Sequence, residues 1–197
     1  TGSTLEIGTA TSGAIAIGDF SPANFTTLVL RTDEGVSQGA VDAGIDVTIA
    51  NLAIDSDTGV DIDVDVSTLA INNADAASNI QIDSNSASLT IGNVTTSTGA
   101  IQGITTNGSA TIAGATALTV ENAITADGTV SLSAVNGVTL SGTNGDVTTN
   151  GGTFTVDADS NNDGTGTYSQ DDVGSAVTTS NGTVSITAGD VSLTGMI

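Results

Sequence analysis

The residue types best suited to metal binding gather in a polar stretch of this sequence, residues 157–172. Four oxygen-bearing side chains alternate with other residues there, namely Asp157, Asp159, Asn161 and Asp163. Gly164 follows directly, and calcium sites use several hard oxygen ligands from a loop that bends at a glycine. The motif is partial, because Gln170 stands where a bidentate glutamate would complete it. Two interpretations follow: a Ca²⁺ site made by these four residues, or a solvated acidic loop.

A second acidic group lies earlier in the chain. Asp61, Asp63 and Asp65 alternate with aliphatic residues, so a strand here would place the three carboxylates on one face, about 6.6 Å apart. Like charges at this spacing repel one another, and cations or salt would relieve the repulsion. Charged side chains also protect strands from uncontrolled pairing, and we favour this solvating role over cation binding.

The composition excludes much catalytic chemistry. The 197 residues include 0 His and 0 Cys, and Arg31 is the single base. A Ser/His/Asp triad, a thiol nucleophile and an imidazole or thiolate zinc site are therefore excluded. Asp171 and Asp172 come nearest to a glycosidase pair, but no His or Lys accompanies them. We expect no enzymatic activity.

The net charge limits the partners of the chain. A formal charge of -21 repels phosphate, so nucleic acid and anionic membranes are not expected to bind. No apolar run approaches the ~18 residues of a membrane span, so we expect no membrane insertion.

Short apolar-x-apolar triplets recur along the whole chain and predict strands. Period two with β-branched residues is typical of strands with one buried face, and Gly, Asn, Asp and Ser between them favour tight turns. No stretch shows a helical period with good helix formers. Examples are Leu5-Glu6-Ile7, Val47-Thr48-Ile49, Leu89-Thr90-Ile91 and Val184-Ser185-Ile186.

The spacing of apolar positions predicts a solenoid. Two interleaved series share a period of about 20 residues: Ile71, Ile91, Ile112 and Leu132, and Ile62, Ile82, Ile101, Val120 and Leu140. Such a period indicates stacked coils with at least two strands each, since one coil alone cannot bury its apolar side chains. The predicted fold is all-β, a parallel β-helix of roughly nine to ten coils. A hairpin-based sandwich with Asn-Gly turns is the structural alternative.

The chain is expected to form a single solenoid over residues 1–197, with two irregular parts. Residues 19–46 break the register and predict an irregular coil or side loop, and residues 157–172 predict a polar acidic loop. Asn51, Asn72 and Asn93 are 21 residues apart, which suggests an internal amide ladder.

These strands, the Gly/Asn/Thr/Ser turns, the scarcity of aromatics and the coil of 19–21 residues resemble the shafts of filamentous-haemagglutinin-like proteins. The resemblance is one of pattern and is clearest over residues 45–150. It implies a right-handed parallel β-helix in a secreted bacterial surface protein. The chain is then expected to be an excised shaft segment or a stacking subunit.

The expected function is structural: an extracellular, non-enzymatic solenoid in a surface fibre, filament or adhesin shaft. The expected partners are further coils, from the same polypeptide or from copies stacked head to tail, together with cell-surface or matrix ligands. No cofactor is required. The alternatives are a Ca²⁺-dependent module and an ice- or glycan-binding module. In the second, the threonine pairs 95–96, 105–106 and 148–149 would contribute to a flat ladder.

Overall fold

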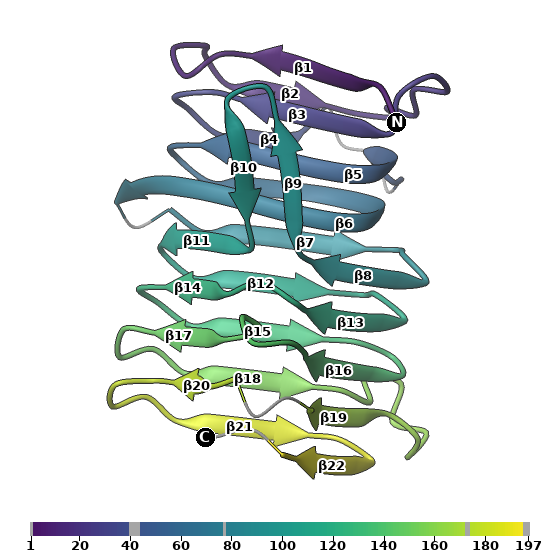
Figure 1. Ribbon diagram of the computed structural model, residues 1–197, viewed down its shortest axis with the longest axis vertical. Coiled ribbons are helices and arrows are strands. Elements are labelled where there is room, and N and C mark those ends of the chain that lie inside the picture. The colour runs from purple at the N-terminus through teal and green to yellow at the C-terminus, as the bar shows by residue number, and fades with distance from the viewer. Residues whose placement is uncertain (1, 40–43, 77, 172–173, 195–197) are drawn as a thin grey trace.

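The computed structural model describes residues 2–39, 44–76, 78–171 and 174–194. The regular elements of this part of the chain are all β-strands. Twenty strands belong to one sheet with parallel pairings, which coils into a solenoid (Figure 1), and two strands form an antiparallel hairpin. The all-β parallel solenoid predicted from the sequence is confirmed. No helix in the described ranges is long and apolar enough to cross a membrane.

The first four levels of the solenoid contain seven strands. Alternating side chains of each strand point into the core, and every inward position stacks on an equivalent position of the next level. The long strands β5 and β6 each extend over more than one face of the coil. In later levels separate strands form these faces. The bounds are β1 Thr4–Gly8, β2 Ile15–Ile17, β3 Thr27–Arg31, β4 Val36–Gln38, β5 Val47–Ser56, β6 Val60–Ala76 and β7 Ile80–Ser84.

The last four levels have three strands each, so the coil has three faces. Strand β8, Ser88–Ile91, stacks on the middle of β6 and continues the face that β13, β16, β19 and β22 then extend. The other two faces continue from β6 and β7. The bounds are β11 Ile104–Asn107, β12 Ala110–Ala113, β13 Ala117–Val120, β14 Ile124–Ala126, β15 Val130–Ser133, β16 Gly137–Leu140, β17 Val147–Thr149, β18 Phe154–Asp157, β19 Thr167–Gln170, β20 Val177–Thr178, β21 Val184–Thr187 and β22 Asp190–Leu193.

Stacked aliphatic side chains form one continuous core. Leu69 of β6 stacks on Ile91, Ile91 on Val120, and Val120 on Leu140, and all four are buried. The largest buried side chain is Tyr168 of β19, and Phe154 of β18 is the next. Because the chain contains few aromatics, its core depends on this repetition of Val, Ile and Leu.

The coil length is not constant at the predicted 20 residues. Val120 stacks on Leu140, 20 residues later, but Ile91 stacks on Val120, 29 later, and Leu140 on Gln170, 30 later. These longer coils carry insertions. The ladder β1–β3–β5–β6–β11–β14–β17–β20 of the described residues has eight levels, and the ladder β1–β3–β5–β6–β8–β13–β16–β19–β22 has nine, the lower end of the predicted nine to ten.

The insertion after Ile91 also displaces both predicted apolar series. Ile91 and Ile112 were assigned to one series, but they lie on different faces, because Ile112 stacks on Ile82 and Leu132. Ile101 is not in the solenoid core at all and belongs to the hairpin. The ten inserted residues equal about half of the predicted period, so Ile112 fits the spacing after Ile91 although the two residues lie on different faces of the coil.

The predicted amide ladder is wrong. Asn51 stacks between Thr27 and Thr68, Asn72 stacks on Asp55, and Asn93 lies in the hairpin. The equal spacing of these three residues arises from unequal coils and does not reflect stacking.

The segment 19–46 contains two regular strands. Strands β3 and β4 pair in register with the levels on both sides, and Phe20 and Phe25 pack partly buried against the core. Residues 40–43 of this segment lie outside the described residues.

Candidate functional site

The hairpin is the main departure from the repeating coil. Strand β9, Asn93–Thr96, pairs antiparallel with β10, Gly99–Gln102. The hairpin crosses the coils at a steep angle and extends toward the N-terminal end (Figure 1). The Gly103 N–H donates a hydrogen bond to the Gly92 carbonyl at 2.7 Å, so the coil closes beneath the insertion and continues in register.

An apolar underside attaches the hairpin to the solenoid. Val94 of β9 and the partly buried Ile101 of β10 pack on Val29, Ala53 and Ala70. The latter three occupy one outward ladder across β3, β5 and β6, yet they are fully buried. The hairpin therefore buries an outer face of three levels as a second, smaller core.

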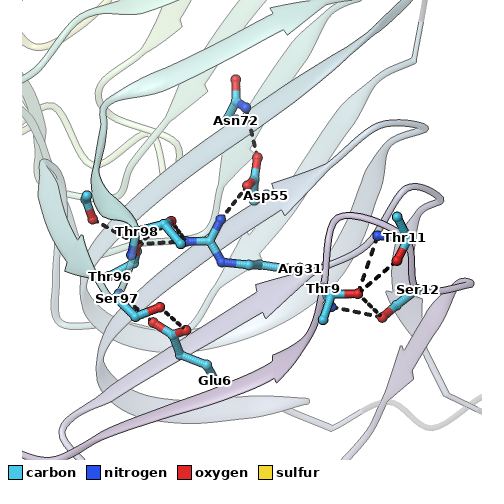
Figure 2. A network of polar contacts seen from close by, with 11 residues as sticks. Glu6, Thr9, Thr11, Ser12, Arg31, Asp55, Asn72, Thr96, Ser97 and Thr98 are labelled. Atoms are coloured by element: carbon cyan, nitrogen blue, oxygen red, sulfur yellow. Dashed lines mark hydrogen bonds and ion pairs between the residues drawn. The ribbon is translucent and has the colours of Figure 1, made fainter.

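The only basic residue of the chain ties the hairpin tip to this face. Arg31 Nη2 donates hydrogen bonds to Thr96 Oγ1 at 2.7 Å and Thr98 Oγ1 at 2.6 Å. Its Nη1 forms an ion pair with Asp55 Oδ2 at 2.7 Å, and Asn72 Nδ2 donates to the other oxygen of Asp55 at 2.8 Å. Figure 2 shows this network. Arg31 Nε is buried and has no hydrogen-bond partner within the described residues.

Glu6 of β1 holds the tip from the other side (Figure 2). The backbone N–H of Ser97 donates to Glu6 Oε1 at 2.6 Å, and Ser97 Oγ donates to Oε2 at 2.5 Å. These bonds, the hydroxyl bond first, lower the pKa of Glu6 below its ordinary value. Two charged side chains on different levels thus fix one two-residue turn.

Grooves lie along both sides of the hairpin. The larger groove, about 750 Å³, has residues 93–97 as one wall and Thr4, Thr27 and Asn51 among its other lining residues. The smaller one, about 330 Å³, is lined by β10 and by the Arg31 network. Among the described residues β9 and β10 pair only with each other, so each groove runs beside an unpaired strand edge.

The four predicted calcium ligands lie in and beside one loop. Asp157 ends β18, and its Oδ1 accepts a hydrogen bond from the Asp159 N–H at 3.3 Å. The buried carboxylate of Asp159 accepts hydrogen bonds from the backbone N–H groups of Asp163 at 3.2 Å and Gly164 at 2.9 Å. The loop therefore uses the Asp159 carboxylate to satisfy its own backbone donors.

Asp163 is held in the same way. Its Oδ2 accepts a hydrogen bond from Asn161 Nδ2 at 2.8 Å, and its Oδ1 accepts one from Thr165 Oγ1 at 2.5 Å. The Thr165 hydroxyl is the main cause of its lowered pKa. No group of three or more acidic residues suited to a metal ion is found in the part of the chain that the structure describes. Asp172, which the sequence placed beside Asp171 as the nearest approach to a glycosidase pair, lies outside the described residues.

The acidic strand adopts the predicted alternation. Ile62 and Val64 are buried, while Asp61, Asp63 and Asp65 point outward from β6. Asp63 accepts a hydrogen bond from Gln38 Nε2 at 3.0 Å. A side chain of a neighbouring level therefore stabilises one of the three carboxylates.

The three threonine pairs named for an ice- or glycan-binding module do not lie together on one face. Thr106 and Thr149 are buried, and Thr95 belongs to the hairpin. Thr105 and Thr148 do share one outward ladder, in which four successive levels carry Thr105, Thr125, Thr148 and Thr178 and the level before them carries Asn72.

Sequence reasoning missed the contact between the hairpin and the solenoid, although one signal was present. The segments Leu28-Val29-Leu30, Leu52-Ala53-Ile54 and Leu69-Ala70-Ile71 are each apolar at three successive positions. A strand that is apolar on both faces is covered on both faces.

Comparison of the chain with protein-family models, with curated proteins and with solved structures finds no match.

Proposed function

We propose that this chain is a structural, non-enzymatic solenoid that forms a segment or subunit of an extracellular fibre, filament or adhesin shaft. The observation that carries the proposal is an uncovered level at the end of the described core. Tyr168 and Gln170 of β19 are fully buried, whereas Val191 and Leu193, which stack directly on them, are 53% and 46% exposed.

Exposed apolar side chains at core positions favour coverage by another coil. The strands β20, β21 and β22 also have one edge unpaired among the described residues, and such edges are templates for further strands. A following coil would satisfy both the apolar side chains and the backbone groups. That coil comes either from continuation of the polypeptide or from a second copy stacked end to end.

The charge supports an extracellular, saline setting. A net charge of -21 keeps rods soluble and opposes their stacking until salt screens it. The pattern resemblance to filamentous-haemagglutinin-like shafts supports the same assignment, including its location at the bacterial surface.

The test compares two neighbouring positions of β22. Leu193→Asp places a charge at the inward position of the exposed end, and Ser192→Asp adds the same charge at the outward position beside it. We expect sedimentation at moderate salt to show end-to-end assemblies for the native chain and Ser192→Asp, but not for Leu193→Asp. Equal assembly by both variants would contradict stacking through this core.

A second candidate function is favoured by the ladder of Thr105, Thr125, Thr148 and Thr178. Evenly stacked hydroxyls on four levels could order water or sugar hydroxyls, as an ice- or glycan-binding face requires. Substitution of Thr125 by Leu would interrupt the ladder at its second level. Loss of binding to ice or to an immobilised glycan in this variant would support the second function, and unchanged absence of binding in both proteins would reject it.

A further inference from the structure

The outer edge of β9 lies open beside a groove. In the described part of the chain, β9 has a strand partner, β10, on one side only. Alternate residues of an antiparallel strand direct their N–H and C=O groups away from the partner. The groove of about 750 Å³ follows that open side, with residues 93–97 along its wall. Space for a further strand therefore exists where backbone donors and acceptors point.

The edge of β9 lacks most of the devices that usually prevent pairing. Natural sheets protect exposed edges with short strands, charges, proline or bulges. Strand β9 is short, at 4 residues, but it reads Asn-Val-Thr-Thr, without charge or proline, and pairs with β10 without a register shift. The hairpin is also fixed in place by Arg31 and Glu6 through the contacts at its tip. The edge is thus presented on a supported element and needs little ordering before it binds.

The groove floor is polar and lies along the direction of β9. Thr4, Thr27 and Asn51 stack on successive levels of one outward ladder and line the groove. A chain paired with β9 would cross these levels one after another, as β9 itself does (Figure 1). Alternate side chains of that chain would then face hydroxyl and amide groups.

Charge selects among extended segments. The chain carries 22 acidic residues against one base, and that base, Arg31, is already paired with Asp55. Glu6 also lines the groove. An acidic segment, including one from a second copy of this chain, would be repelled, whereas a basic segment would be attracted and steered to the surface.

We propose that the groove beside β9 binds an extended basic peptide segment, which adds a third strand to the β9–β10 hairpin. In this mode backbone hydrogen bonds to the edge supply affinity, and alternate side chains supply specificity. The site is independent of end-to-end stacking, so failure of either proposal leaves the other intact.

The first experiment tests the edge with a labelled peptide of alternating lysine and valine. Fluorescence anisotropy measures its binding to the native chain, alongside two N-methylated versions, one methylated at every lysine and one at every valine. Because N–H groups alternate in direction along a strand, only one version keeps its donors toward β9. We expect one version to bind at least about tenfold more weakly than the other, a difference of ~1.4 kcal/mol. Equal binding would show a merely electrostatic contact and would overturn the proposal.

Charge and position are tested separately. A glutamate–valine peptide of the same length should bind at least about tenfold more weakly than the lysine–valine peptide, and equal binding would reject a basic partner.

The position of the peptide is tested with two variants of the chain. Thr27→Lys fills the groove, while Thr139→Lys adds the same charge on the same outward ladder, outside the groove. We expect only Thr27→Lys to lower the affinity by about tenfold, and equal losses would place the peptide elsewhere on the acidic surface.

Discussion

Arg31 and Thr98 are 67 residues apart in the sequence, yet the guanidinium Nη2 donates a hydrogen bond to the Thr98 hydroxyl at 2.6 Å. This bond joins the second level of the solenoid to the tip of an insertion that leaves it after β8. The hairpin therefore links levels that otherwise contact only their neighbours. In a solenoid, where stability is mostly a sum of neighbouring interfaces, such a link couples distant levels.

Removal of Arg31 should release the hairpin tip. In Arg31→Met the hydroxyls of Thr96 and Thr98 lose their donor and Asp55 loses its ion pair. We expect faster amide hydrogen exchange at Ser97 and Thr98. Asp61→Asn, which changes one charge on an exposed strand face, serves as the control. Unchanged exchange in Arg31→Met would show that the apolar underside alone holds the hairpin.

The apolar underside of the hairpin should contribute more to stability than its exposed face. Val94 is 3% exposed and packs on Val29 and Ala53, so Val94→Ala leaves a small cavity and should lower the free energy of unfolding by ~1–2 kcal/mol. Thr95→Ala, one position along the same strand, should change it by less than about 0.5 kcal/mol. Urea denaturation of both variants measures the difference, and equal effects would contradict burial by the hairpin.

Attachment of the tip should weaken in acid. The Ser97 bonds lower the pKa of Glu6 from its ordinary 4.5 in the folded state, so this contribution is complete above pH 4.5. It is lost as the pH falls through the lowered pKa. The amide resonance of Ser97 should therefore shift as the pH falls below about 4.5. In Glu6→Gln that shift should vanish, while a persistent shift would assign it to another acid.

The single tyrosine should lose its proton only at unusually high pH. Burial raises the pKa of Tyr168 to about 12, above its ordinary value of 10.0. The folded state therefore favours the neutral phenol. Stability from this group is complete below pH 10 and decreases as the pH rises toward the folded-state value. Phenolate absorbance, which reports only this residue, should show little ionisation at pH 11 in the folded chain and should appear with unfolding. Ionisation near pH 10 without unfolding would contradict its burial.

The acidic loop should keep its structure without calcium. Its carboxylates already accept hydrogen bonds from the loop backbone, above all Asp159 from Asp163 and Gly164. We expect EDTA to leave the melting temperature unchanged, and Asp159→Ala to destabilise the chain by ~1–2 kcal/mol with or without calcium. A rise in melting temperature on adding calcium, absent in Asp159→Ala, would instead support the Ca²⁺-dependent alternative.

The coil architecture was predictable because burial imposes period two on every strand and stacking imposes a longer period. Neither constraint distinguishes a coil strand from the hairpin. Val94 and Ile101 have the same local pattern as core residues, and Ile101 also fits the period by coincidence. What sets the hairpin apart is where its apolar face packs, which depends on residues 29, 53 and 70 far away in the sequence. The role of Arg31 was hidden for the same reason, since its partners Thr96 and Thr98 become neighbours only after the hairpin folds back.

Imaging of the native chain tests the structural function most directly. Eight to nine levels at ~4.8 Å per level give a rod about 40 Å long, with Val191 and Leu193 exposed at one end. Negative-stain electron microscopy at moderate and low salt should show unbranched filaments several rod lengths long, which shorten as the salt is lowered and repulsion between acidic copies grows. Isolated particles of single-rod length at every salt concentration would contradict end-to-end assembly of this chain.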